Sequence, residues 1–177
     1  MNINDAVVLD ATTQEGFAGS PLVQLSGGGT VLNAFNIQAG GSGSTIRGFV
    51  LNGFLDDAID VSGDNNRIAG NWIGTDTTGN AAAALRNADG GIRIRTGADG
   101  NTIGGTTPAD RNVISGNGIG ADTTDNGITL QGGNNVVQGN YIGVGADGTT
   151  LIGNADEGMD VGTGATNNLI GGTGAGE

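Results

Sequence analysis

The sequence predicts an all-β fold, a right-handed single-stranded parallel β-helix of about five to six coils, each with three short strands. Three observations predict this solenoid. One segment recurs at a nearly fixed period, glycine is abundant at 38 of 177 residues, and the hydrophobic residues (36%) include few aromatics (3%). Frequent glycine indicates frequent turns, and a core without aromatics must be narrow and filled by small aliphatic side chains. Residues 1–177 are expected to form one domain.

The recurring segment fixes the period of the solenoid. It reads NRIAGNWIG from Asn66 and returns as NVVQGNYIG from Asn135; a variant with an insertion begins at Asn101, and a partial copy begins at Asn168. Successive copies are displaced by 35, 34 and 33 residues. A repeat of this size is typical of a stack in which each unit contacts its neighbours.

Each copy of the repeat follows a segment in which apolar and polar residues alternate, as in a strand with one buried face. We therefore expect a coil to consist of this alternating strand, then an Asn-x-Ile-x-Gly strand, then an Asn-x-Ile strand. Equivalent positions of successive coils should form three inward columns: Ile59, Ile92, Ile128 and Met159; Ile68, Ile103, Val137 and Ile170; and Ile73, Ile114 and Ile142.

The unequal copies indicate insertions in a shorter coil. The segment that begins at Ser44 precedes Asn66 in the same register by 22 residues, which defines the bare coil. The extra residues of later coils follow the third strand at 75–89 and 145–157, and lie one corner earlier at 106–111. These insertions should be loops on one side of the scaffold.

A ladder of asparagines is predicted at one corner of the coil, before the second strand. Asn66, Asn101, Asn135 and Asn168 share this position. Asparagine tolerates left-handed backbone geometry, and stacked side-chain amides can hydrogen bond to the residues above and below.

Composition excludes several classes of partner and chemistry. The chain carries a net charge of −12, with six arginines and no histidine or cysteine. Nucleic acid is not expected as a partner, because its phosphates require a basic face. No segment is apolar enough to insert into a membrane or to serve as a signal peptide, so a secreted parent protein would have its leader outside this sequence. Sites that use His, Cys or zinc are excluded, and no cofactor is required.

Four segments carry a resemblance to a known family. They are DATTQ from Asp10, NWIGTD from Asn71, NTIGGTT from Asn101 and RNVISGN from Arg111. The chain resembles the right-handed parallel β-helix repeats of large bacterial secreted and surface proteins of the adhesin type. This resemblance implies an extracellular or cell-surface location and a structural role. The sequence stops in mid-coil, which indicates an excised piece of a longer stack or ends that associate with other protomers.

Two sets of outward residues are candidates for ligand binding. Asp60 and Arg93 share an outward column, which suits either a surface ion-pair ladder or a polysaccharide lyase in which calcium acidifies the sugar and the arginine acts as base. Trp72 and Tyr141 share a register two coils apart, and suit either sugar stacking or burial beneath an inserted loop such as residues 81–85.

Four aspartates in loops rich in Gly, Thr and Asn are candidate ligands for calcium. They are Asp76, Asp122, Asp125 and Asp147. Carboxylate and carbonyl oxygens suit a hard cation such as calcium, although no complete calcium-binding loop motif is present. The alternative is that these aspartates belong to ordinary solvated turns.

The preferred functional hypothesis is a non-catalytic structural or assembly module, a stalk, spacer or fibre-forming subunit that stacks head to tail. A carbohydrate-binding module on the face of Trp72 and Tyr141 is the first alternative, with polysaccharide as partner. A polysaccharide lyase or hydrolase is the second, and would require an acidic cleft with two suitably placed carboxylates.

Overall fold

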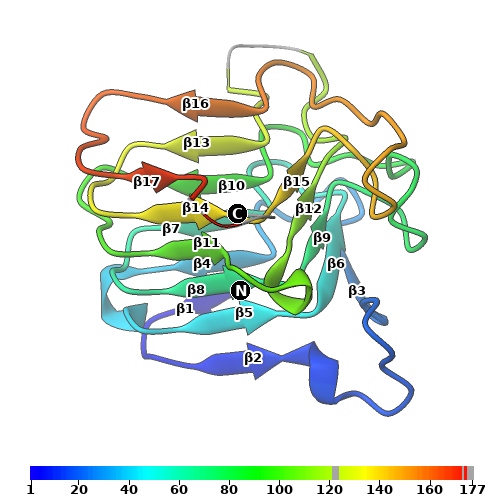
Figure 1. Cartoon of the computed structure of the whole chain (residues 1–177), viewed down its shortest axis with the longest axis horizontal. Coiled ribbons are helices and arrows are strands. Elements are labelled where there is room, and N and C mark those ends of the chain that lie inside the picture. Colours follow the sequence, from blue (N-terminus) through cyan, green and yellow to red (C-terminus); the bar gives the residue numbers. More distant parts are fainter. Residues whose placement is uncertain (121–123, 173, 175–177) are drawn as a thin grey trace.

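The computed structural model, which describes residues 1–120, 124–172 and 174, is a parallel β-helix (Figure 1). The first sheet consists, in spatial order, of β1 (Asn2–Ile3), β4 (Phe35–Ile37), β7 (Ile59–Val61), β10 (Ile92–Ile94), β13 (Ile128–Leu130) and β16 (Met159–Val161). The second consists of β2 (Val8–Asp10), β5 (Thr45–Arg47), β8 (Arg67–Ala69), β11 (Thr102–Gly104), β14 (Val136–Gln138) and β17 (Leu169–Ile170). The third consists of β3 (Val23–Ser26), β6 (Phe49–Asn52), β9 (Trp72–Ile73), β12 (Val113–Ile114) and β15 (Tyr141–Ile142).

Each of the first five coils contributes one strand to each sheet, and β16 and β17 belong to a sixth, so the predicted fold class is confirmed. β7, β8 and β9 form one coil, and each strand pairs in parallel with its equivalents in the neighbouring coils. Helical structure in the described residues is confined to the short 3₁₀ segments η1 (Ala11–Thr13), η2 (Ala39–Gly41) and η3 (Pro108–Asp110). None of the described helices has the length or hydropathy to cross a membrane.

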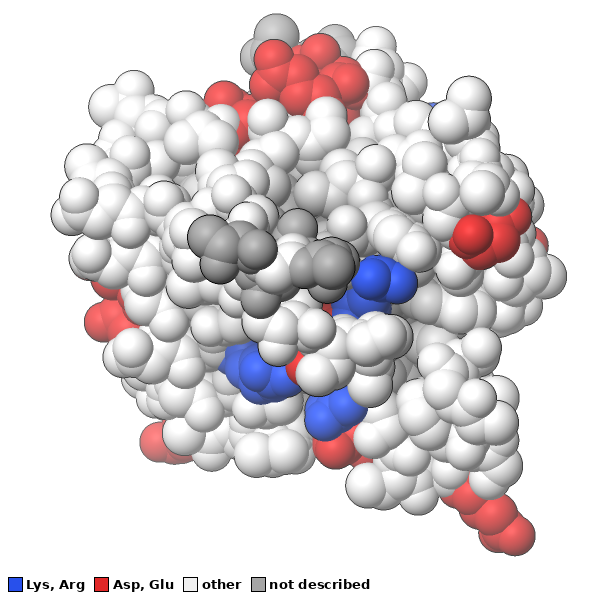
Figure 2. Space-filling view, in the orientation of Figure 1, with Lys and Arg blue, Asp and Glu red and all other residues white. Residues whose placement is uncertain are grey.

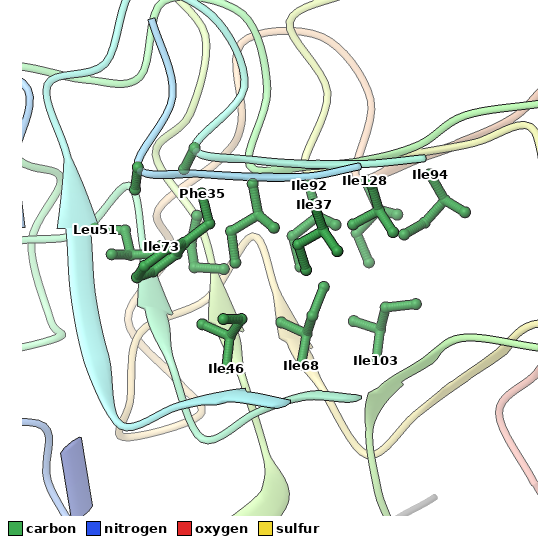
Figure 3. Close-up of a cluster of buried hydrophobic side chains, with 14 of the residues drawn as sticks. Phe35, Ile37, Ile46, Leu51, Ile68, Ile73, Ile92, Ile94, Ile103 and Ile128 are labelled. Carbon is green, nitrogen blue, oxygen red and sulfur yellow. The ribbon is translucent and has the colours of Figure 1, made fainter. Parts of the chain in front are cut away.

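The register of the sheets confirms the three predicted inward columns. Ile59 pairs with Ile92, which pairs with Ile128, and the same alignment holds along the other two columns. The isoleucines in the middle of the stack are fully buried. Figure 3 shows side chains of the first and second sheets pointing toward one another across a single layer, so the core is one side chain deep from each sheet.

Left-handed backbone at the first corner falls one residue before the predicted position. The residues with positive φ are Asn65 (56°), Asn134 (55°) and Asn167 (56°), whereas Asn66 and its equivalents are not among them. The expectation that the ladder asparagines adopt this geometry is therefore wrong. Asparagine is among the few non-glycine residues that tolerate it. At these three corners two asparagines stand side by side: the first adopts the left-handed turn, and the second belongs to the ladder.

The insertions lie where the sequence predicted them. Residues 75–89 and 145–157 follow β9 and β15, and each begins with an antiparallel bridge, Thr75 to Ala82 and Val144 to Leu151. The two loops contact each other, because the Ala146 N–H donates to the Gly79 carbonyl at 2.8 Å. Residues 106–111 contain η3 and connect β11 to β12.

Replacement of Ile103 by Asp is expected to unfold the whole stack. Ile103 is fully buried, and an unpaired buried carboxylate costs several kcal/mol, a large fraction of a total stability of about 5–15 kcal/mol. Thermal unfolding followed by circular dichroism measures the effect. The matched control is Ile119→Asp, at a side chain that is 64% exposed; equal melting temperatures for the two variants would contradict the register.

Candidate functional site

The most extensive polar arrangement in the molecule is a set of carboxamide ladders, one at each corner of the coil. In the first ladder, Asn66 donates from its backbone N and from Nδ2 to Asn101 Oδ1 at 2.8 and 2.9 Å. Asn101 donates in the same way to Asn135 Oδ1, and the backbone N of Asn135 donates to Asn168 Oδ1. Ser44 N joins the other end at 2.8 Å from Asn66 Oδ1. The structure thus brings the four predicted ladder asparagines into one column.

A second ladder lies at the corner between the second and third sheets. Asn71 donates from N and Nδ2 to Asn112 Oδ1 at 2.9 and 3.2 Å, and Asn112 donates from the same two atoms to Asn140 Oδ1. Phe49 N donates to Asn71 Oδ1. Sequence reasoning missed this ladder, although its signal was present as the asparagine that opens each Asn-x-Ile strand.

A third ladder lies where the chain leaves the third sheet. Asn87 Nδ2 donates to Asn117 Oδ1 at 2.8 Å, and Asn117 donates from N and Nδ2 to Asn154 Oδ1, both at 3.0 Å. Phe54 N donates to Asn87 Oδ1. This ladder was also missed, because its members are separated by insertions of different length and share no constant spacing in the sequence.

The ladders satisfy the hydrogen-bonding capacity of the buried amides. Asn71, Asn112 and Asn117 also donate from Nδ2 to backbone carbonyls of the preceding coil, at 2.9–3.1 Å. All three are buried. A buried polar network with every member satisfied rigidifies a structure, whereas one unsatisfied member destabilises it.

The predicted aromatic face is covered by the insertions. Trp72 pairs in register with Val113, which pairs with Tyr141. Trp72 is 9% exposed and packs in a small apolar cluster with Val50 and Val113. The loop that covers Trp72 includes Gly79, where an added Cβ would lie 3.0 Å from the indole. The burial alternative therefore describes Trp72 better than sugar stacking, and the covering loop begins before residues 81–85.

Tyr141 is half-buried and already has a partner on its ring. The guanidinium of Arg111 stacks 4.1 Å from the ring centroid, and the loop at Gly148 approaches the phenol closely. A cation–π contact of this kind occupies the ring face that a sugar would need. Trp72 and Tyr141 therefore do not form an open aromatic platform.

The outward column of Asp60 and Arg93 forms a different ion pair from the one suggested. The two residues are in register, but both oxygens of Asp60 accept from Arg95, from Nε at 2.7 Å and from an Nη atom. The Asp60 side chain is 3% exposed. A bidentate, buried carboxylate of this kind holds two coils together and is not accessible to a polymeric substrate.

Asp57, in the corner next to this column, carries the largest resolved pKa shift of a buried acid. It is 2% exposed, and its Oδ1 accepts from Gly90 N at 3.1 Å. Burial, followed by the repulsion of Asp56, raises its pKa to about 7, with Asp60 and Asp89 adding to the repulsion and Arg93 opposing it. The carboxyl group titrates near neutrality because it lies in a crowded acidic corner.

The candidate calcium ligands are engaged in separate turns. Asp76 Oδ1 accepts from the N and Oγ1 of Thr78. Hydrogen bonds from the backbone of Thr150 and Thr149 lower the pKa of Asp147 to about 2. Asp125 is buried, and Asp122 lies outside the described residues. The described part of the chain contains no group of three or more potential metal ligands.

Comparison with family models, with curated proteins and with solved structures gives no match.

Truncation of one central ladder residue is expected to destabilise the protein by about 3 kcal/mol or more. In Asn101→Ala, the backbone N and Nδ2 of Asn66 lose their acceptor inside a dry corner, and each unsatisfied buried donor costs about 1–3 kcal/mol. Chemical denaturation gives the free energy of unfolding. Asn168→Ala is the control, because Asn168 is partly solvated and water can replace its bonds. Equal decreases in the free energy of unfolding of the two variants would contradict a cooperative ladder.

Asp57 is expected to make the protein less stable as the pH rises. Its pKa is higher in the folded state (about 7) than its ordinary value of 3.8, so the folded state binds more protons and the free energy of unfolding falls between about pH 4 and pH 7. Asp57→Asn keeps an acceptor for Gly90 N and should gain on the order of 4 kcal/mol relative to the natural chain above pH 7. Below pH 4 the free energies of unfolding of the variant and of the natural chain should become equal.

Denaturation curves across this pH range measure the effect. Asp5→Asn, at an exposed carboxylate, controls for the change in net charge. A gain that is independent of pH, or equal in both variants, would show that Asp57 is not the titrating group.

Proposed function

We propose that the chain is a non-catalytic structural and assembly module, a stalk, spacer or fibre-forming subunit of an extracellular or bacterial cell-surface protein. The observation that carries this proposal is the set of three buried carboxamide ladders. They join successive coils at every corner, so bending or local opening of the stack breaks satisfied buried hydrogen bonds. A rod with this resistance suits a spacer that holds other parts of a protein apart.

The use of the polar side chains supports the same role. Asp60 is neutralised by Arg95, Asp76 and Asp147 cap turns in the inserted loops, and Trp72 is covered. These four residues, selected in the sequence as candidates for a polysaccharide, a sugar or calcium, thus have structural partners within the scaffold. The resemblance to adhesin-type repeats supports the extracellular location.

The edge of the stack at β16 and β17 suggests how such modules associate. Val161, Leu169 and Ile170 are each about half exposed, at 50%, 50% and 51%. Strand edges with apolar side chains are covered in proteins by further backbone. Another coil would cover this edge, and we propose that a second copy of the chain can supply it by stacking head to tail.

The assembly proposal predicts that particle mass and length increase with protein concentration. Light scattering combined with electron microscopy, with and without calcium, should show thin rods that lengthen as the concentration rises and do not require calcium. Ile170→Asp places a charge on the stacking edge and should keep the protein monomeric. Leu151→Asp is the control, at a loop side chain that is 85% exposed. A natural chain that stays monomeric at all concentrations would overturn the assembly role.

A further inference from the structure

A groove lies at the corner between the second and third sheets, where two consecutive coils carry no insertion. β5 connects to β6 through Gly48, and β8 connects to β9 through Gly70 and Asn71. The coil before them carries residues 11–22 at this corner, and the coil after them carries residues 105–112. These two segments form walls separated by three coil steps, or about 14 Å at 4.8 Å a step.

Glycine at both bare corners allows the walls to pack closely. A Cβ on Gly48 would lie 2.8 Å from Thr12 Cγ2 of one wall, and a Cβ on Gly70 would lie 2.8 Å from the Ala109 carbonyl of the other. Both glycines have positive φ, at 80° and 65°. Any side chain at these two corners would collide with the adjacent wall, so the glycines allow both walls to pack against the bare coils.

The groove has the size of a small-molecule site. Its volume is about 330 Å³, at the lower end of the range for ligand pockets, which begins at about 300 Å³. Phe17, Trp72, Pro108 and Val113 are among its apolar lining residues, and Arg47 and Arg111 are its charged ones. Apolar walls with a few convergent polar groups are typical of sites for small organic ligands.

The charge at this corner is opposite to that of the protein as a whole. Arg47 lies 3.8 Å from Asp10, and Arg67 lies 2.6 Å from Asp110. Arg111 has no carboxylate within ion-pair distance among the described residues. The cluster therefore carries one net positive charge in a chain of −12, and Figure 2 shows basic surface gathered near the centre of this face.

The two arginines that line the groove retain hydrogen-bonding capacity. Arg47 Nε is buried and has no hydrogen-bond partner in the described part of the chain, and its contact with Asp10 at 3.8 Å exceeds hydrogen-bond length. Arg111 is held by its Nε, which donates to the Gly139 carbonyl at 2.9 Å, and by its stacking on Tyr141. Arg111 is therefore positioned without a carboxylate partner among the residues that the structure describes, and Arg47 has only the distant charge of Asp10; guanidinium groups of this kind bind carboxylates strongly.

We propose that this corner groove binds a small organic carboxylate whose apolar body lies against Phe17, Trp72 and Val113 and whose charged group is held by Arg47 and Arg111. The apolar side chains of the lining suit a hydrophobic ring or short chain, and the two arginines suit its carboxylate. The inference does not rest on the structural role proposed above, because the groove opens on the side of the stack and not at the exposed edge of β16 and β17.

Trp72 is the single tryptophan of the chain and lines the groove, so its fluorescence reports on occupancy directly. Cyclohexanecarboxylate is expected to change the emission in a saturable way and to bind at least about tenfold more tightly than cyclohexanecarboxamide, its neutral isostere. The affinity should decrease as salt is added. Equal affinities for the two compounds, or no saturable change with either, would overturn the proposal.

Two substitutions with opposite effects separate binding from a merely structural role. Arg47→Gln should weaken cyclohexanecarboxylate about tenfold or more. Asp10→Asn keeps an acceptor for Thr12 but removes the charge that opposes the ligand, so it should strengthen binding about threefold. Arg86→Gln, at an exposed arginine outside the groove, should change nothing.

Melting curves identify any variant that fails to fold, and Asp10→Asn then carries the test. If Arg47→Gln folds and binds normally, or if Asp10→Asn does not bind more tightly, Arg47 does not hold the anion and the proposal fails. Glucuronate is the remaining probe. Glucuronate should bind more weakly than cyclohexanecarboxylate. Tighter binding of glucuronate would show that the groove prefers an acidic sugar, and would contradict the proposal that the ligand has an apolar body.

Discussion

The in-register stacking of parallel coils is the constraint on which the rest of the structure depends. Adjacent strands are fixed about 4.8 Å apart by their backbone hydrogen bonds, so each side chain lies directly above its equivalent in the next coil. A buried polar group at a corner then has two neighbours within reach, one above and one below. Asparagine suits this position because its amide can donate in one direction and accept from the other, and the three ladders use it in this way.

The same constraint decides where the chain can vary. The residue at an inward strand position can change only if the new side chain still packs against its equivalents in the coils above and below. This constraint explains the repeated isoleucines of the core. A corner is different, because the backbone leaves the sheet there and can return after any number of residues. The insertions at 75–89, 106–111 and 145–157 all leave from corners, and the space that they enclose is determined by the coils that lack them.

This division explains what could be predicted from the sequence. The columns of Ile59 and Ile68 and the first asparagine ladder follow from residues that recur at a nearly constant spacing. The ladder of Asn87 and Asn117 has no such spacing, because insertions of unequal length separate its members. The pairing of Asp60 with Arg95 was missed for another reason: it runs diagonally between coils, whereas the column placed Arg93 opposite Asp60. The corner groove depends on two loops from distant coils, which no local pattern contains.

The rigidity of the stacked coils also determines the geometry of the groove. The walls at residues 11–22 and 105–112 belong to coils that are three steps apart, so their separation is constant only if the coils between them neither slip nor open. The ladder of Asn71 and Asn112 runs through the corner beneath the groove and fixes these coils where the walls need them. A rigid stack therefore positions guanidinium and apolar side chains from several coils without further support, and this preorganisation lowers the cost of ordering a site when a ligand binds.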